Sequence, residues 1–203
     1  NPMGTYHKAP EIERMIEAIP DGCLLVLDEA YIELAPEDAA PAIAPDDPRV
    51  IRMRTFSKGY GMAGARVGYA VGHPDLINAF NKVRNHFGMN RMSQAGALAA
   101  LADEAYLGDV IARVQKSRDR IATIALENGL SPIPSATNFV AIDCGQDGEF
   151  AKKVVTELGK LGVFVRMPFV APQNRCIRVS CGPAEALAYF AQALPKALKA
   201  AHG

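Results

Sequence analysis

The chain has 203 residues, of which 49% are hydrophobic and 22% are charged, and its 22 basic and 22 acidic residues leave no formal net charge at pH 7. These proportions are typical of a globular protein of one or two domains with a sizeable core. The balanced charge provides no basic footprint for nucleic acid, and the apolar runs are too short to span a bilayer. We therefore expect neither a nucleic acid nor a membrane as a partner.

The cysteine and histidine positions do not match the spacing of a metal site. Cys23, Cys144, Cys176 and Cys181 form no C-x-x-C pair, and the four histidines show no ligand pattern. We expect no metal, and we interpret the cysteines as buried free thiols of a cytoplasmic protein.

The first part of the chain alternates between helical and extended patterns. Residues 9–19 place their apolar side chains on one helix face. Residues 23–31, CLLVLDEAY, form an apolar run that ends in acids, which predicts a buried parallel strand with a polar carboxyl end. Residues 33–49 are rich in proline and acidic residues, which predicts a surface excursion. Residues 50–54 and 67–71 predict two more strands, joined by a glycine-rich loop.

The remainder begins with helical periodicity and then mixes both patterns. It predicts helices over 74–86, 92–103 and 107–128, with Gly129 as the residue that ends the last of them. The elements expected after that are a strand at 138–143, a helix at 149–162, strands at 163–166 and 176–181, and a helix at 184–200.

This order of elements predicts two domains. Residues 1–106 read as an α/β domain, and residues 107–203 read as a smaller α+β domain that begins with a long linking helix.

Reactive side chains follow two of the predicted strands. Asp28 and Tyr31 come just after the first strand, and Lys58 and Arg66 flank the glycine-rich loop after the next. Open α/β sheets place their ligand sites at the carboxyl ends of such strands, so we expect these four side chains to converge. An amine, a carboxylate, a phenol and a guanidinium suit pyridoxal phosphate. The lysine would form a Schiff base with the cofactor aldehyde, while the aspartate would pair with the pyridinium nitrogen.

The phosphate of such a cofactor also has candidate ligands here. Arg66 can bind a phosphate through two parallel hydrogen bonds. The hydroxyls of Thr55 and Ser57, just before Lys58, could add further hydrogen bonds.

Five motifs occur along the chain in an order that resembles a known family. They are NP-x-G-T from Asn1, DEAY from Asp28, TFSK ending at Lys58, GARVGY around Arg66 and RVS from Arg178. This set resembles the fold-type I pyridoxal-phosphate aminotransferases, most closely the histidinol-phosphate aminotransferase branch. The resemblance implies a mostly parallel-sheet cofactor domain, of which residues 1–106 would be the C-terminal part, followed by a smaller α+β domain.

The resemblance also implies which residues hold the cofactor. Asn1 and Tyr31 would contact its phenolic oxygen, and the phosphate would be held by Thr55, Ser57 and Arg66.

The roles implied for catalysis and for substrate binding fall on four residues. Asp28 would pair with the ring nitrogen, and Lys58 would be the Schiff-base lysine and the proton carrier. Arg178 would grip a substrate anion, and Arg166 matches an arginine that faces the substrate in the closest branch. Tyr31 would assist catalysis from the phenolic side.

The expected function is an aminotransferase that moves an amino group between an amino acid, or histidinol phosphate, and a 2-oxo acid, in a homodimer. Two alternatives stay open. Decarboxylation or elimination could occur on the same fold, because the cofactor's electron sink serves all of these reactions. The chain could also be a non-catalytic fragment or binding module, because the N-terminal portion typical of the family is missing and Met3 stands where a threonine is usual.

Several neighbouring residues have a structural interpretation instead. Tyr60, Tyr69 and Phe169 are expected to pack rather than to contact substrate. Asn90 and Asn138 match polar positions of the family near the domain junction, and capping of a turn explains them as well. Arg175 lies close enough to Arg166 in the sequence to compete with it for the anion.

Overall fold

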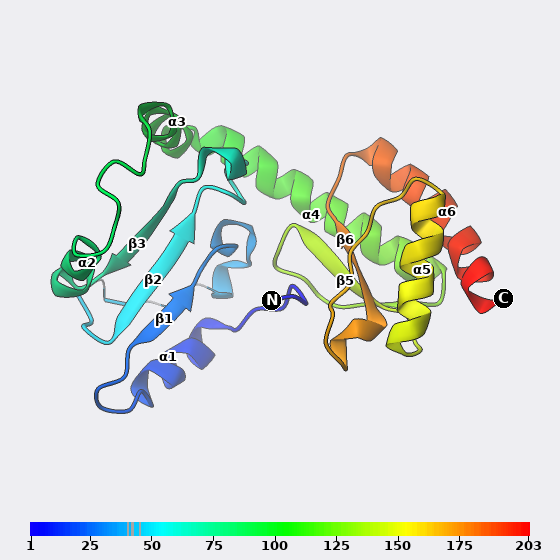
Figure 1. Cartoon of the computed structure of the whole chain (residues 1–203), viewed down its shortest axis with the longest axis horizontal. Helices are drawn as coiled ribbons and strands as arrows, with labels where there is room; N and C mark the ends of the chain where they lie inside the picture. Colours follow the sequence, from blue (N-terminus) through cyan, green and yellow to red (C-terminus); the bar gives the residue numbers. More distant parts are fainter. Residues whose placement is uncertain (40, 42, 45) are drawn as a thin grey trace. The chain divides into compact units, whose positions relative to one another are not determined.

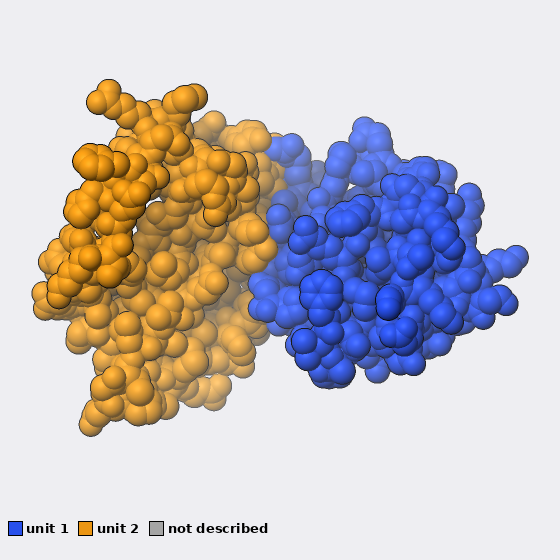
Figure 2. Space-filling view, viewed as in Figure 1, with its two compact units in different colours: residues 1–5, 112–203 blue, residues 6–111 orange. Residues whose placement is uncertain are grey.

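The computed structural model describes residues 1–203 with the exception of residues 40, 42 and 45. The chain divides into two compact units, one of residues 1–5 and 112–203 and the other of residues 6–111 (Figure 2). We call them unit 1 and unit 2. Their division falls inside helix α4 (Glu104–Glu127), and the first five residues join the unit formed by the end of the chain.

Unit 2 contains a three-stranded sheet in the order β1-β2-β3 (Figure 1). The strands are β1 (Leu25–Asp28), β2 (Val50–Thr55) and β3 (Gly68–Gly72). β1 runs parallel to β2, as the sequence predicts, whereas β3 is antiparallel to β2. The carboxyl ends of β1 and β2 therefore lie at the same edge of the sheet.

The two faces of this sheet are distinguished by the packing of helix α1 (Ala9–Glu17). Its buried Ile12 and Ile16 pack with Val50, and Leu25 and Leu27 lie against the same cluster. Because successive strand residues point to opposite faces and directly paired residues share a face, the intervening residues lie on the other side. We call these the α1 face and the opposite face.

The exposure of β1 on the opposite face differs from what the sequence predicted. Residues 23–31 were expected to form a buried strand, but Val26 on this face is 58% exposed and Leu24 is 47% exposed. In the part of the chain that the structure describes, β1 is half-buried or exposed along its length, because α1 covers only one of its faces. Cys23 is exposed as well, so the expectation of a buried thiol was wrong for this residue, whereas Cys144 and Cys176 are buried.

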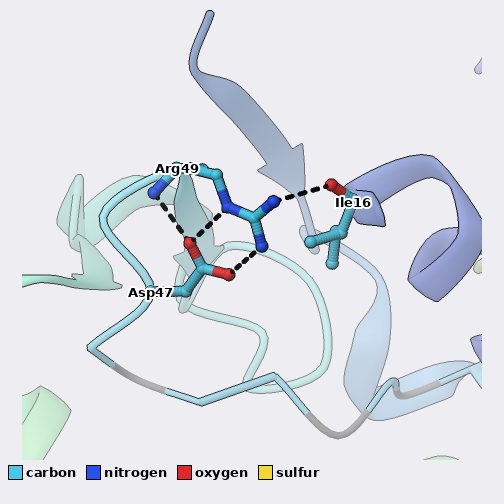
Figure 3. Close-up of polar contacts among 3 residues, drawn as sticks. All are labelled: Ile16, Asp47 and Arg49. Carbon is cyan, nitrogen blue, oxygen red and sulfur yellow. Dashed lines mark hydrogen bonds and ion pairs between the residues drawn. The ribbon is translucent and has the colours of Figure 1, made fainter. Parts of the chain in front are cut away.

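An arginine in the segment between β1 and β2 forms a hydrogen bond with α1. Arg49 donates from Nη1 to the Ile16 carbonyl at 3.3 Å, and its Nε and Nη2 donate to Asp47 at 3.1 and 2.9 Å (Figure 3). These hydrogen bonds hold the pKa of Asp47 below its ordinary value. The carbonyls of the last helical turn have no partner within the helix, so Arg49 both satisfies one of them and anchors the start of β2.

Within that segment lie two short 3₁₀ turns, η1 (Ile32–Leu34) and η2 (Glu37–Ala39). Leu34 and Ala39 are buried, so this part of the predicted surface excursion turns back into the core.

The helices of unit 2 after the sheet are α2 (Pro74–Phe80), α3 (Arg91–Ala102) and the beginning of α4. The helix predicted over 74–86 was too long. Val83 is 83% exposed and Phe87 is 94% exposed, so the continuation has no packed apolar face to stabilise it. Asn90 accepts a hydrogen bond from the Ser93 N–H and caps α3, which confirms its expected capping role.

Unit 1 contains a second sheet, antiparallel throughout, in the order β4-β5-β6. Its strands are β4 (Ser131–Pro132), β5 (Phe139–Asp143) and β6 (Cys176–Ser180). The end of α4 packs with α5 (Gly148–Lys160) and α6 (Ala184–His202) around a core whose largest fully buried side chains include Ile121, Ile124, Ile142, Leu158, Ile177 and Leu194. Gly129 has φ +72°, so it ends α4 in the left-handed conformation that the sequence predicts.

One predicted strand of unit 1 is not a strand. Residues 163–166 pair with β6 only through a bridge between Arg166 and Arg178, whose backbone groups exchange hydrogen bonds of 3.1 and 2.6 Å. Val165 is buried in the core, but Phe164 is 85% exposed, and Pro168, which follows, has no N–H to donate to a longer ladder. The two-residue β4 was not predicted, because so short a strand leaves no periodicity to detect.

Burial also raises the pKa of the cysteine thiols in unit 1. It raises the pKa of Cys144 to about 11. Such a thiol stays protonated at neutral pH and packs as a small apolar group. Within the described residues, no helix combines the length and the apolar character needed to cross a membrane.

Candidate functional site

Asp28 is the last residue of β1 and lies exposed at the carboxyl edge of the unit 2 sheet. Its register partner on β2 is Met53, and Thr55 lies two positions further along β2. The alternation of strand residues places all three on the opposite face, away from α1. Asp28 Oδ1 accepts a hydrogen bond from the Ala30 N–H at 3.0 Å, which orients the carboxylate at the turn after the strand.

The loop that carries Lys58 begins directly after β2 and is anchored by two residues before the lysine. The Thr55 hydroxyl donates to the Val67 carbonyl at 3.3 Å and accepts from the Ser57 N–H at 3.1 Å. Phe56 is 3% exposed, and its ring lies 4.8 Å from that of Tyr60 between centroids. A buried aromatic anchor and a hydroxyl bridge therefore hold the loop, so Lys58 can be presented while remaining half-buried.

Gly59, next to Lys58, is required by close packing. A Cβ at this position would lie 3.0 Å from the Glu33 Cβ, tighter than ordinary van der Waals contact. The residue after the lysine thus allows the loop to approach the segment that follows β1.

Tyr31 and Lys58 meet across these two segments. The Lys58 Nζ lies 5.2 Å from the centroid of the Tyr31 ring, within the range of a cation–π contact. The amine and the phenol, which are 27 positions apart in the printed sequence, are therefore neighbours in unit 2.

Arg66 follows the 3₁₀ turn η3 (Ala63–Ala65) in a left-handed conformation with φ 57° and ψ 47°. Among the described residues it is the one non-glycine residue with positive φ, an arrangement that costs on the order of 1 kcal/mol. Its Nη1 donates to the Ala63 carbonyl at 2.8 Å, and the Ser93 hydroxyl holds the neighbouring Ala65 carbonyl at 2.7 Å. The turn thus holds an exposed guanidinium in a fixed direction.

Asn1 lies in unit 1, in a turn closed by its own side chain. Its Oδ1 accepts from the Gly4 N–H at 2.8 Å. Gly4 has φ +84°, and a Cβ there would lie 2.6 Å from the Ser135 Oγ, so the NP-x-G-T turn requires glycine at this point. The Gly4 carbonyl also accepts from the Ala136 N–H at 2.8 Å.

Arg166 and Arg178 line one pocket of unit 1, with a volume of about 740 Å³. The guanidinium carbon of Arg178 lies 4.3 Å from the centroid of the Phe139 ring, which supports its flat face. Arg175, by contrast, donates from Nε to Asp143 at 2.9 Å and does not line this pocket.

Phe169 lines the same pocket and is 95% exposed, so the expectation that it packs in the interior was wrong. It follows Pro168 in a loop, and no apolar periodicity marks its position. Tyr60 and Tyr69 do pack, as expected, beside Phe56, Val67 and Ala97.

The nine residues predicted to form the site thus fall into two groups, one in each unit. Unit 2 holds Asp28, Tyr31, Thr55, Ser57, Lys58 and Arg66, and unit 1 holds Asn1, Arg166 and Arg178. The donor set of unit 2 matches the parts of pyridoxal phosphate. It offers an amine for the aldehyde, a carboxylate for the ring nitrogen, and hydroxyls with a guanidinium for the phosphate.

Sequence reasoning missed two acidic residues beside this group. Glu29 is 5% exposed and paired with Arg52 and Arg54, and the Glu33 carboxyl is buried with no hydrogen-bond partner among the described residues. The sequence did contain a signal for Glu29, namely Arg52 and Arg54 at alternate positions of β2. Two cations on one face of a partly buried strand need an anion as a partner.

Known proteins resemble this chain in sequence over most of its length. The family model described as aminotransferase class I and II matches residues 1–194. Histidinol-phosphate aminotransferase 1 of Nitrosococcus oceani is 39% identical over 202 residues, which are 98% of this chain and 54% of that protein. The aromatic amino acid aminotransferase of Nocardia farcinica is 43% identical over 150 residues, which are 71% of this chain and 42% of that protein.

A solved structure shows the same similarity in three dimensions. The histidinol-phosphate aminotransferase from Sinorhizobium meliloti, in complex with pyridoxal-5'-phosphate, has a TM-score of 0.95 and 51% sequence identity, covering 98% of this chain and 55% of that one. The chain spans about half the length of the curated relatives it matches.

Proposed function

The chain belongs to the aminotransferase class I and II family, and from this premise we propose that the full-length protein is a pyridoxal-phosphate-dependent aminotransferase. It transfers an amino group between histidinol phosphate, or an amino acid, and a 2-oxo acid. The observation that carries this proposal is Lys58, held on the loop after β2 with its Nζ 5.2 Å from the Tyr31 ring, at the sheet edge where Asp28 ends β1.

Pyridoxal phosphate, when bound, supplies an electron sink for the substrate's Cα carbanion. Lys58 would hold the cofactor through its aldehyde carbon, and its Nζ would carry the proton between the substrate Cα and the cofactor C4′. Asp28 keeps the ring nitrogen protonated, because an adjacent negative charge favours the cationic form. Tyr31 acts from the phenolic side of the ring beside the Lys58 amine.

Other residues orient the two ligands. Thr55, Ser57 and Arg66 bind the cofactor phosphate, and the rigid turn around Arg66 lowers the entropy lost when it does so. Asn1 binds at the phenolic oxygen. Arg178 binds the substrate carboxylate from its platform on Phe139, with Arg166 beside it for a second anionic group.

The proposed substrate specificity is tested by replacing Arg178 and Arg166 one at a time in the full-length protein. Arg178→Ala is expected to weaken amino-acid and 2-oxo-acid substrates alike, by roughly 2–5 kcal/mol in kcat/KM if the contact is desolvated. Arg166→Ala is expected to weaken only substrates with a second anion, such as histidinol phosphate. Steady-state kinetics with histidinol phosphate and with phenylalanine measure both effects. Arg175→Ala, which lies outside the pocket, is the control.

Unchanged histidinol phosphate turnover in Arg166→Ala would contradict the histidinol-phosphate assignment. A general or aromatic 2-oxo-acid aminotransferase would then be the better description, which the similarity to the Nocardia farcinica enzyme favours as second candidate. Release of carbon dioxide in place of a keto acid would instead indicate decarboxylation.

We further propose that the full-length protein is a homodimer with its site near the subunit boundary, a proposal that the family membership supports. Light scattering on the active protein is expected to give twice the mass of one polypeptide. A fully active monomer would contradict this proposal.

A further inference from the structure

A buried cluster of charges lies directly behind the candidate site. Glu29 is 5% exposed, although charged side chains are almost never so buried unless they are paired. Its Oε1 accepts a hydrogen bond from Arg52 Nε at 2.9 Å and forms an ion pair with Arg52 Nη2 at 2.8 Å. Its Oε2 accepts from Arg54 Nε at 2.7 Å. One carboxylate just after β1 thus joins two arginines of β2.

The position of this cluster on the sheet connects it to the site. Glu29 directly follows Asp28, and Arg54 directly precedes Thr55. The Glu29 N–H also donates to the Met53 carbonyl at 2.9 Å, which extends the β1–β2 pairing past the end of β1. Because strand residues alternate, the ion pairs lie on the α1 face while Asp28 and Thr55 lie on the opposite face.

The cluster also reaches the segments around Lys58. Arg54 pairs across the sheet with Tyr69, whose ring packs with Phe56 just before Lys58. Burial raises the pKa of the Glu33 carboxyl, and the nearby Arg54 charge partly offsets this effect. Glu33 in turn packs against Gly59, the residue after Lys58. Arg54 therefore contacts the residue that follows β1 and lies near the Glu33 carboxyl, whose side chain packs beside Gly59.

We propose that Glu29, Arg52 and Arg54 are positioning residues that lock the carboxyl ends of β1 and β2 together and so set the spacing between Asp28 and the Lys58 loop. A buried ion pair contributes less to stability than well-packed apolar residues would, but its hydrogen bonds fix one geometry. Groups that hold a cofactor must stay within a fraction of an ångström of their productive positions. This inference rests on the proposed function, because it concerns how the cofactor is held.

The test uses the full-length protein, with pyridoxal 5'-phosphate as the probe. Glu29→Gln keeps the side-chain size but removes the charge, and Arg52→Lys keeps the charge but removes the two-nitrogen contact with Oε1. Glu29→Gln is expected to raise the dissociation constant for pyridoxal 5'-phosphate by roughly 10- to 100-fold, and Arg52→Lys by a smaller factor. The pH midpoint of the bound-cofactor absorbance band is expected to shift in both, because Asp28 moves relative to the ring nitrogen. A purely structural role would change the unfolding midpoint without moving this titration.

Asp47→Asn is the matched control, because Asp47 also holds the Nε and Nη2 of an arginine in unit 2 but lies before the amino end of β2. Because an exposed ion pair contributes little, Asp47→Asn is expected to keep the dissociation constant within about twofold of the parent value. The titration midpoint is expected to stay within about 0.2 pH units of the parent midpoint. If Glu29→Gln does not fold, Arg52→Lys decides the question. Folded variants that bind the cofactor and titrate like the parent would overturn this inference. A parent protein that does not bind pyridoxal 5'-phosphate would instead overturn the proposed function.

Discussion

Lys58→Ala is expected to abolish amino transfer by the full-length protein and to remove its covalent link to pyridoxal phosphate. Lys58 is the amine that the structure presents beside Tyr31, on a loop anchored by the buried Phe56. Loss of a positioned proton carrier alone lowers a rate by roughly 10²–10⁴-fold, and loss of the cofactor attachment adds to this. Single-turnover assays with the amino donor, followed by absorbance of the cofactor, measure the effect.

Borohydride reduction followed by peptide mapping identifies the attached lysine independently. The reduced cofactor is expected on the peptide that contains Lys58. Lys82 is the matched control, because it lies exposed in the same unit after α2, and Lys82→Ala is expected to retain activity and label. A label found on Lys82 would show that the assignment of Lys58 is wrong.

Asp28→Ala is expected to retain some bound cofactor but to lose on the order of a hundredfold in kcat, which corresponds to about 2.7 kcal/mol of the barrier. Asp28 ends β1 on the opposite face of the sheet, with Oδ1 held by the Ala30 N–H. Without this carboxylate the ring nitrogen is no longer kept protonated, so the electron sink weakens while the phosphate contacts remain.

Pre-steady-state rates and the cofactor absorbance spectrum of Asp28→Ala measure this prediction, with Asp21→Ala as the control. Asp21 is an exposed acidic residue of the turn before β1, so its replacement removes the same charge from unit 2 without touching the sheet edge. An Asp28→Ala enzyme within a few fold of the parent rate would contradict the role of Asp28.

Some parts of the structure could be predicted because their signals are local. The apolar run of β1 stops at the acidic Asp28, where the strand ends, and Gly129 ends α4 because only glycine adopts its conformation without strain. Asn90 caps α3 through a bond to a residue three positions away. In each case the residues involved lie within a few positions of one another in the sequence.

Other parts depend on partners that are distant in the sequence. The expected strand at 163–166 had the right composition, and Val165 is buried in the core, but the segment contributes one bridge and Phe164 is 85% exposed. Strand propensity describes the fit to a half-buried surface, and how far that surface extends depends on residues distant in the sequence. The exposed Val26 of β1 and the overlong helix at 74–86 failed for the same reason.

The sequence by itself determined which reactive side chains the protein has, their order and the strand ends that carry them. These are covalent and local properties, and Lys58, Asp28 and Arg66 could be proposed as site residues from them. The tertiary structure alone decided that Glu29 is buried between Arg52 and Arg54 and that Asn1 joins the unit of Arg178. A carboxylate and a guanidinium attract each other in any register, and only the parallel pairing of β1 with β2 brings these particular charges within hydrogen-bond distance.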